Sequence, residues 1–190
     1  VPYNASAALQ TLPTIILTLH PESPELRNLT ALLKFHRLEN VHVFEGTNGH
    51  SIWGGEGDTK WPAGGMRAGE LGVRQSHRDI LKAAWASGLE RLLLLEDDVI
   101  PACDLSARLE AALDDEACGR IALEAGEGED GRGGILMLGA TEYSKWPGLL
   151  EEVAGSPPEK PPKLCYTCNQ GTYGAFAVVY SRAAIPYVLR

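Results

Sequence analysis

Three consecutive carboxylates follow a run of four leucines, and this part of the sequence is the best suited to do chemistry. Residues 92–95 are all leucine, which predicts a strand buried on both faces, and Glu96, Asp97 and Asp98 come directly after it. Neighbouring carboxylates repel one another, and a bound cation is the usual remedy. Strand alternation places Glu96 and Asp98 on one face and Asp97 on the other. The alternative is an acidic turn that caps the next helix.

Ligands of open α/β sheets bind at the carboxyl ends of the strands, where these side chains are expected to lie. Oxygen ligands suit Mg²⁺ or Mn²⁺, and either ion can bridge to the diphosphate of a substrate. We therefore predict a divalent-cation site at the end of this strand.

A second candidate site lies at the start of a helical pattern. Gly69 and Gly72 come first, and Ser76 and His77 follow them. Glycines at a helix start permit close backbone approach, and free N–H groups there can receive an anion. The alternative is a glycine-containing loop followed by an ordinary helix, in which His77 is a packing residue with its hydrogen bonds satisfied.

The elements that must position these residues are readable from hydrophobic periodicity. Residues 14–19 and 41–44 predict two buried strands, and residues 24–38 predict an amphipathic helix with an N-cap at Ser23 and proline at its first position. The apolar face of that helix comprises Leu26, Leu29, Leu33 and His36. This strand–helix–strand opening predicts an α/β fold with a mostly parallel sheet flanked by helices.

The remaining pattern continues the same architecture. Residues 69–86 predict a helix whose buried face comprises Val73, His77, Ile80, Leu81 and Ala84. Asp104 is expected to cap a helix that runs to Leu113, residues 135–138 and 175–180 predict further strands, and Ser181 is expected to open a last helix.

Three glycine-, acid- or proline-rich segments, 45–68, 124–134 and 155–163, are predicted to be loops within a single domain of residues 1–190. The first contains Trp53 and Trp61, and we expect it to be a lid over a bound ligand.

Composition excludes several classes of protein. The chain has 190 residues, 44% of them hydrophobic, which is too many for a disordered chain. Its formal net charge of -8 argues against general nucleic-acid binding, although a local basic pocket for one nucleotide is permitted. No apolar run approaches the roughly 20 residues of a membrane helix, so no transmembrane segment is expected.

In combination, the two motifs resemble a known family. The segment 69–77, GELGVRQSH, followed about twenty residues later by LLLLEDDV at 92–99, resembles the paired hallmark of glycosyltransferase family 25. This family includes lipooligosaccharide and collagen galactosyltransferases. Weaker similarities follow in order, at Thr18 with Arg27, at residues 44–46, at 135–139 and at 171–184. The resemblance covers about residues 14–190, without the glycine-rich loops.

The resemblance implies a GT-A-like nucleotide-binding fold that transfers a sugar, often galactose, from a UDP-sugar to a hydroxyl of a glycan or protein acceptor, with inversion. Glu96 and Asp98 would hold Mn²⁺ (or Mg²⁺) against the diphosphate, and Asp97 would face the ribose or a neighbouring strand. Thr18, in the matching first strand, would bind the donor, and Arg27 would contact the base or a phosphate. The donor pocket would be lined by Gly69, Glu70, Gly72, Ser76 and His77.

The sequence departs from the family at two places. Val73 and Arg74 stand where the family often has a cysteine or small residue. The family also continues beyond the position of Arg190, so we expect an incomplete domain. An inverting transferase needs a general base. Glu142 is the candidate, with a solvated loop carboxylate as the alternative; if the base lies further on, the chain would bind donor and transfer little.

Two other functions remain open. One is a nucleotidyl- or phosphoryl-transferring enzyme with the same acidic site, although the chain has no GxxxxGK[ST] loop. The other is a catalytically inactive carbohydrate- or nucleotide-binding relative of the same fold, in which Trp53, Trp61 and Trp146 could stack on sugar rings.

Overall fold

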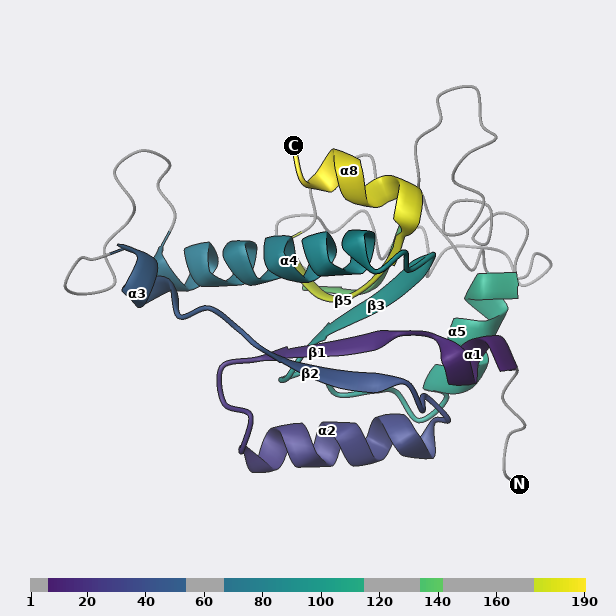
Figure 1. The fold of residues 1–190 in the computed structure, drawn as a ribbon. Helices are drawn as coiled ribbons and strands as arrows, with labels where there is room; N and C mark the ends of the chain where they lie inside the picture. The colour runs from purple at the N-terminus through teal and green to yellow at the C-terminus, as the bar shows by residue number, and fades with distance from the viewer. Residues whose placement is uncertain (1–6, 54–66, 115–133, 142–172) are drawn as a thin grey trace, which may run out of the picture.

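The computed structural model describes residues 7–53, 67–114, 134–141 and 173–190 (Figure 1). In chain order the elements are α1 (Ala7–Thr11), β1 (Thr14–Thr18), α2 (Pro24–Phe35), β2 (Val41–Glu45), α3 (Gly49–Trp53), α4 (Ala68–Ala86), β3 (Arg91–Glu96), α5 (Leu105–Asp114), β4 (Ile135–Thr141), β5 (Tyr173–Ser181), the 3₁₀ helix η1 (Arg182–Ala184) and α8 (Ile185–Val188).

The described strands form one mixed sheet in the order β2-β1-β3-β5-β4. β1 pairs in parallel with both β2 and β3, whereas β5 pairs antiparallel with β3 and with β4. β5 therefore runs against the other four described strands. The prediction of an α/β fold with parallel core strands is confirmed, and the sequence pattern did not indicate the reversed strand.

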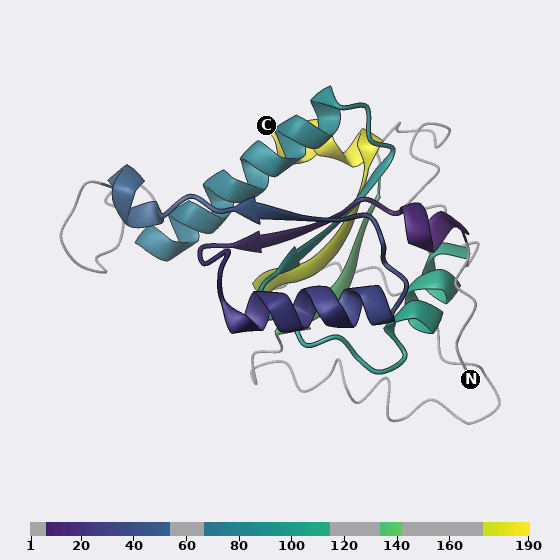
Figure 2. The ribbon, with the colours of Figure 1, turned by 60° about the horizontal axis from the view of Figure 1, so that its bottom comes forward.

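Helices cover both faces of the sheet (Figures 1 and 2). Residues from α1, α2 and α5 pack with one face of the strands in a buried cluster that contains Ile16, Leu93 and Val179. Residues from α4 and α8 pack on the opposite face, in a cluster that contains Leu17, Leu94 and Val178. The central strand β3 contributes to both clusters because its four leucines alternate between the two faces. The prediction that residues 92–95 are buried on both sides is confirmed.

α2 begins as predicted and ends earlier. Ser23 Oγ accepts a hydrogen bond from the N–H of Leu26 at 3.1 Å, and proline occupies the first turn. The helix stops at Phe35 because Arg37 adopts a left-handed conformation with a φ of 64°, and the N–H of Leu38 then binds the carbonyl of Leu33 at 3.0 Å. His36 is buried beyond the helix end, as expected for a core position.

Two predictions from the sequence are wrong: that all of segment 45–68 is a loop, and that Val73 lies on the buried face of its helix. Segment 45–68 contains the helix α3 and, at its start and end, residues of β2 and α4; its residues 54–66 lie outside the described part of the chain. Val73 is 42% exposed because the first half of α4 extends past the strand ends beside α3, so its inner face there meets α3 instead of the sheet (Figure 1). Ile80, Leu81 and Ala84 are buried as predicted. The predicted loop 155–163, and 124–134 up to residue 133, also lie outside the described residues.

Candidate functional site

The three acidic residues lie at the carboxyl ends of the three parallel strands. Glu96 is the last residue of β3, and Asp97 and Asp98 form the turn that follows. Register brings these ends together, because Leu17 of β1 pairs with Glu96 and Thr18 pairs with Glu45 of β2. Glu96 and Asp97 are half-buried and Asp98 is exposed. This is the edge of the sheet at which a ligand of an α/β protein is expected.

Charge repulsion at this edge is visible in the pKa of Glu96. Burial of its carboxyl group, followed by the charges of Asp98 and then Asp97, raises this pKa from 4.5 to about 7. A cation held between these groups would remove the repulsion and favour ionised Glu96. The electrostatics are thus those expected of a divalent-cation site.

Asp97 is held toward the neighbouring strand. Its Oδ2 accepts a short hydrogen bond from the hydroxyl of Thr18, the last residue of β1. The Thr18 oxygen also accepts the backbone N–H of His20 at 2.9 Å, and the side chain is buried. Of the two orientations expected for Asp97, this contact corresponds to the one that faces an adjacent strand. The hydroxyl of Thr18 makes both bonds within the protein.

His77 brings a nitrogen atom to the same place from α4. Its Nε2 lies 3.9 Å from Glu96 Oε1, too far for a hydrogen bond. This nitrogen is buried and has no hydrogen-bond partner among the described residues. Burial lowers the pKa of the imidazole. Within the described part of the chain, the Nε2 atom of His77 therefore lacks the hydrogen bond that the alternative interpretation required.

The start of α4 is shaped by close contact with the segment after β2. A Cβ atom at Gly72 would lie 2.5 Å from the carbonyl oxygen of Thr47, and one at Gly49 would lie 1.6 Å from that of Ala68. Ser76 Oγ donates to the carbonyl of Gly72 at 2.7 Å and accepts the N–H of Thr47 at 2.8 Å. Glycine at 72 is thus required for packing against the segment after β2, whereas the sequence prediction placed an anion at this helix start.

Two other residues of this motif have different surroundings. A Cβ atom at Gly69 would meet nothing within 4 Å, so this position makes no close approach. Glu70 Oε2 accepts the backbone N–H of Arg67 at 2.9 Å and so caps the start of α4. The structure therefore gives Gly72, Ser76 and Glu70 structural contacts, and among the motif residues it brings His77 to the carboxylates.

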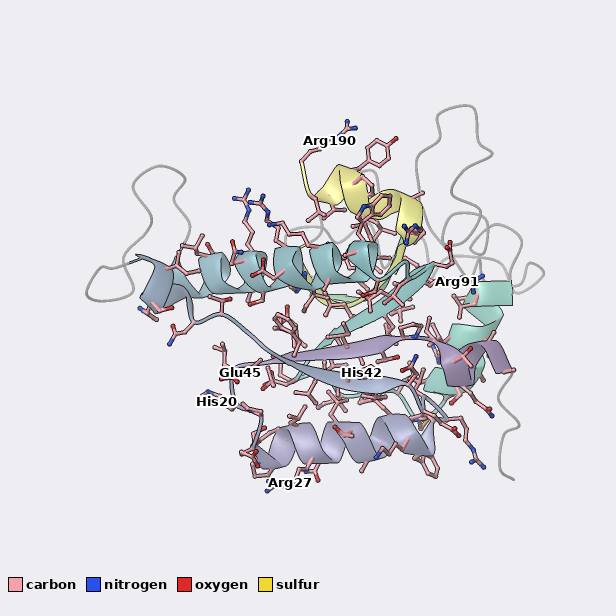
Figure 3. All side chains as sticks on the ribbon, in the orientation of Figure 1. His20, Arg27, His42, Glu45, Arg91 and Arg190 are labelled. Atoms are coloured by element: carbon pink, nitrogen blue, oxygen red, sulfur yellow. The ribbon has the colours of Figure 1, made fainter. Side chains whose placement is uncertain are left out.

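Arg27 lies on α2 and is exposed. Its Nη1 donates to the carbonyl of Glu22 at 2.8 Å. Figure 3 shows Arg27 on the side of α2 that faces away from the sheet, whereas His20 and Glu45 lie nearer the strand ends. The structure does not bring Arg27 to the acidic residues in this arrangement. Glu142, the candidate base, lies outside the described residues.

The carboxylates of Glu96 and Asp98 fit a cation that takes most of its ligands from substrate and water. Among the described residues, no group of three or more His, Cys, Asp or Glu side chains could hold a metal ion by itself. Mg²⁺ and similar ions commonly use one or two carboxylates together with substrate phosphates and water. Glu96 and Asp98 supply that number. The raised pKa of Glu96 shows that they stand close enough to repel.

No protein-family model matches the chain, and no curated protein matches it. The resemblance to glycosyltransferase family 25 accordingly stays a prediction. In the described part of the chain no helix has the length and apolar character needed to span a membrane.

Sequence reasoning missed the contacts that organise the strand ends. Ser76 and Gly72 were selected as donor-pocket residues, and their contacts with the segment after β2 were not foreseen. The signal was present, because Gly46 and Gly49 flank Thr47 at the exit of a predicted strand. Glycines placed there indicate that another backbone passes close by.

Proposed function

We propose that the chain is a metal-dependent glycosyltransferase domain that transfers a sugar, galactose in our proposal, from a UDP-sugar to a hydroxyl with inversion. The observation that carries the proposal is the group of carboxylates at the end of β3, at the carboxyl edge of parallel strands, where burial and then the charges of Asp98 and Asp97 raise the pKa of Glu96 to about 7. The resemblance of residues 69–77 and 92–99 to family 25 supplies the reaction class.

Glu96 and Asp98 would hold the cation against the diphosphate of the donor. A divalent cation supplies Lewis-acid stabilisation of the negative charge that develops on the leaving UDP. Asp97 is engaged by Thr18 and is left out of this pair. The Nε2 atom of His77, which has no hydrogen-bond partner among the described residues, lies beside Glu96 and would bind a hydroxyl of the donor. Burial lowers the pKa of this imidazole and so favours its neutral form, in which Nε2 either accepts or donates one hydrogen bond, depending on the tautomer.

The test is calorimetric titration of UDP into the protein with Mn²⁺ and with EDTA, alongside Asp98→Asn. We expect UDP to bind only when Mn²⁺ is present and expect Asp98→Asn to abolish binding. Glu90→Ala is the matched control, because Glu90 is an exposed acid immediately before the amino end of β3. Binding in EDTA equal to that in Mn²⁺ would contradict the proposed metal site.

Transfer is tested separately from binding. We expect slow release of UDP from UDP-galactose in the presence of Mn²⁺, and faster release when acceptor hydroxyls are added. Binding of UDP with no turnover of UDP-galactose, UDP-glucose or their N-acetyl analogues would favour an inactive nucleotide-binding relative.

A further inference from the structure

We propose that Thr18 is a positioning residue whose hydroxyl fixes Asp97 in a non-ligand orientation, so that Glu96 and Asp98 alone face the cation. The inference deepens the proposed function and rests on it. It gives different roles to the carboxylates of Glu96, Asp97 and Asp98, which are adjacent in the sequence.

The Thr18 hydroxyl is engaged both as a donor and as an acceptor within the protein. A threonine hydroxyl has one proton to donate and an oxygen that can accept. The proton is given to Asp97 Oδ2, and the oxygen accepts the N–H of His20 at 2.9 Å. Thr18 is only 2% exposed, so solvent cannot easily replace either partner. Donation of this hydroxyl's proton to a substrate would require the loss of its buried bond to Asp97.

Thr18 lies between the ends of β2 and β3 and contacts both. Its carbonyl oxygen accepts the N–H of Gly46, the residue after β2, at 2.7 Å. Its side chain reaches Asp97, the residue after β3. Thr18 thereby joins the ends of all three parallel strands, and it is anchored on both sides. A residue held in this way can impose one orientation on a carboxylate that follows a strand end.

The bond between Thr18 and Asp97 also affects the neighbouring Asp98. Asp97 and Asp98 are consecutive in a turn, so the direction in which Asp97 is held constrains the peptide from which Asp98 projects. Removing the hydroxyl leaves a half-buried carboxylate without its partner, and that carboxylate would turn toward the nearest positive charge. In a site that holds a cation, the nearest charge is the cation itself. The ligand geometry would then be lost.

The experiment compares the affinity of the protein for Mn²⁺, in the presence of saturating UDP, among Thr18→Val, Thr18→Ser and wild type. Valine matches the shape of threonine without the hydroxyl, and serine keeps the hydroxyl. Mutation of a group outside the ligand shell that keeps the ligands in place typically weakens metal binding by about 10- to 100-fold. We expect about a tenfold loss or more in Thr18→Val and near wild-type affinity in Thr18→Ser.

Thr14→Val is the matched control. Thr14 begins the same strand, is fully buried, and donates its hydroxyl to the carbonyl of Leu12 at 3.1 Å. It lies at the opposite end of β1, so its loss should lower stability without changing the affinity for Mn²⁺. Equal affinities in Thr18→Val and Thr14→Val would overturn the inference while leaving the proposed function intact. A folded wild-type protein that binds no Mn²⁺ with UDP would overturn both.

A second pair of variants covers the case in which Thr18→Val does not fold. Asparagine at position 97 keeps an oxygen that can accept the Thr18 proton and loses only the charge. We expect Asp97→Asn to retain Mn²⁺ binding and Asp98→Asn to lose it. Equal losses in the two variants would make Asp97 a direct ligand and would overturn the inference.

Discussion

Glu96, Asp97 and Asp98 are adjacent in sequence and occupy three different environments. Glu96 is half-buried beside the unpartnered nitrogen of His77, Asp97 is bonded to Thr18, and Asp98 is exposed. Their place at a strand end could be predicted, because four buried leucines precede them. The contact between Thr18 and Asp97 could not be predicted, because it joins residues 79 positions apart and depends on how β1 and β3 are aligned.

The raised pKa of Glu96 predicts a specific dependence of stability on pH. Between about pH 4.5 and pH 7 the folded protein retains a proton on Glu96 that the unfolded chain has released, so stability falls as the pH rises through this window. The full shift corresponds to at most about 3 kcal/mol, and contact with solvent reduces this to about 1 to 2 kcal/mol.

The measurement is the free energy of unfolding in urea at pH 4.5 and pH 7.5, without divalent metal. Other groups titrate in this range, so the quantity of interest is the difference between wild type and Glu96→Gln. We expect the variant to gain stability relative to wild type at the higher pH. A difference that is the same at both pH values would show that Glu96 titrates normally.

At the scale of elements, the junction of α3 with α4 is the part that periodicity could not anticipate. The glycine-rich composition of residues 45–68 indicated a loop, whereas contacts of Gly49 and Gly72 with opposing backbone stabilise a short helix there. Helix α2 was easier to predict, because capping by Ser23 and the spacing of three leucines are local signals. Its early end follows from the positive φ of Arg37, which no residue type at that position indicated.

Two glycines three positions apart in α4 should respond oppositely to the same substitution. Gly72→Ala forces a methyl group against the carbonyl of Thr47, so we expect a loss of about 1 to 3 kcal/mol in the free energy of unfolding. Gly69→Ala meets open space, and its stability should be unchanged or rise by up to about 1 kcal/mol. Thermal unfolding of the two variants checks this, and equal losses would show that the junction does not require close approach.

At the scale of the whole molecule, the sheet connects the two hydrophobic clusters, because one cluster lies on each of its faces. The helix-covered α/β architecture follows from the sequence, because the predicted strands are short and apolar and amphipathic helical patterns at 24–38 and 69–86 lie between them. The reversed direction of β5 does not follow from the sequence. Strand direction is set by pairing with β3 and β4, and the hydrophobic pattern is the same for either direction.

This arrangement predicts a single cooperative unfolding transition. Leu93 and Leu94 are adjacent in β3, are fully buried, and belong to opposite clusters. Truncation of either to alanine should cost about 2 to 5 kcal/mol and should shift the whole transition in urea, followed by both circular dichroism and tryptophan fluorescence. Two separated transitions in either variant would mean that the faces of the sheet unfold independently.

The contact between Gly49 and Ala68 also bears on how this protein tolerates change. The carbonyl of Ala68 would lie 1.6 Å from a Cβ atom at Gly49, so the first residue of α3 and the first residue of α4 lie in close backbone contact. This contact closes the stretch of chain that begins with α3 and ends at the start of α4. The entropic cost of such a closure grows only with the logarithm of length, about 0.6 kcal/mol for each doubling. Insertions or deletions between Trp53 and Arg67 are therefore inexpensive for folding, and evolution is free to vary this segment while the strand ends below it stay fixed.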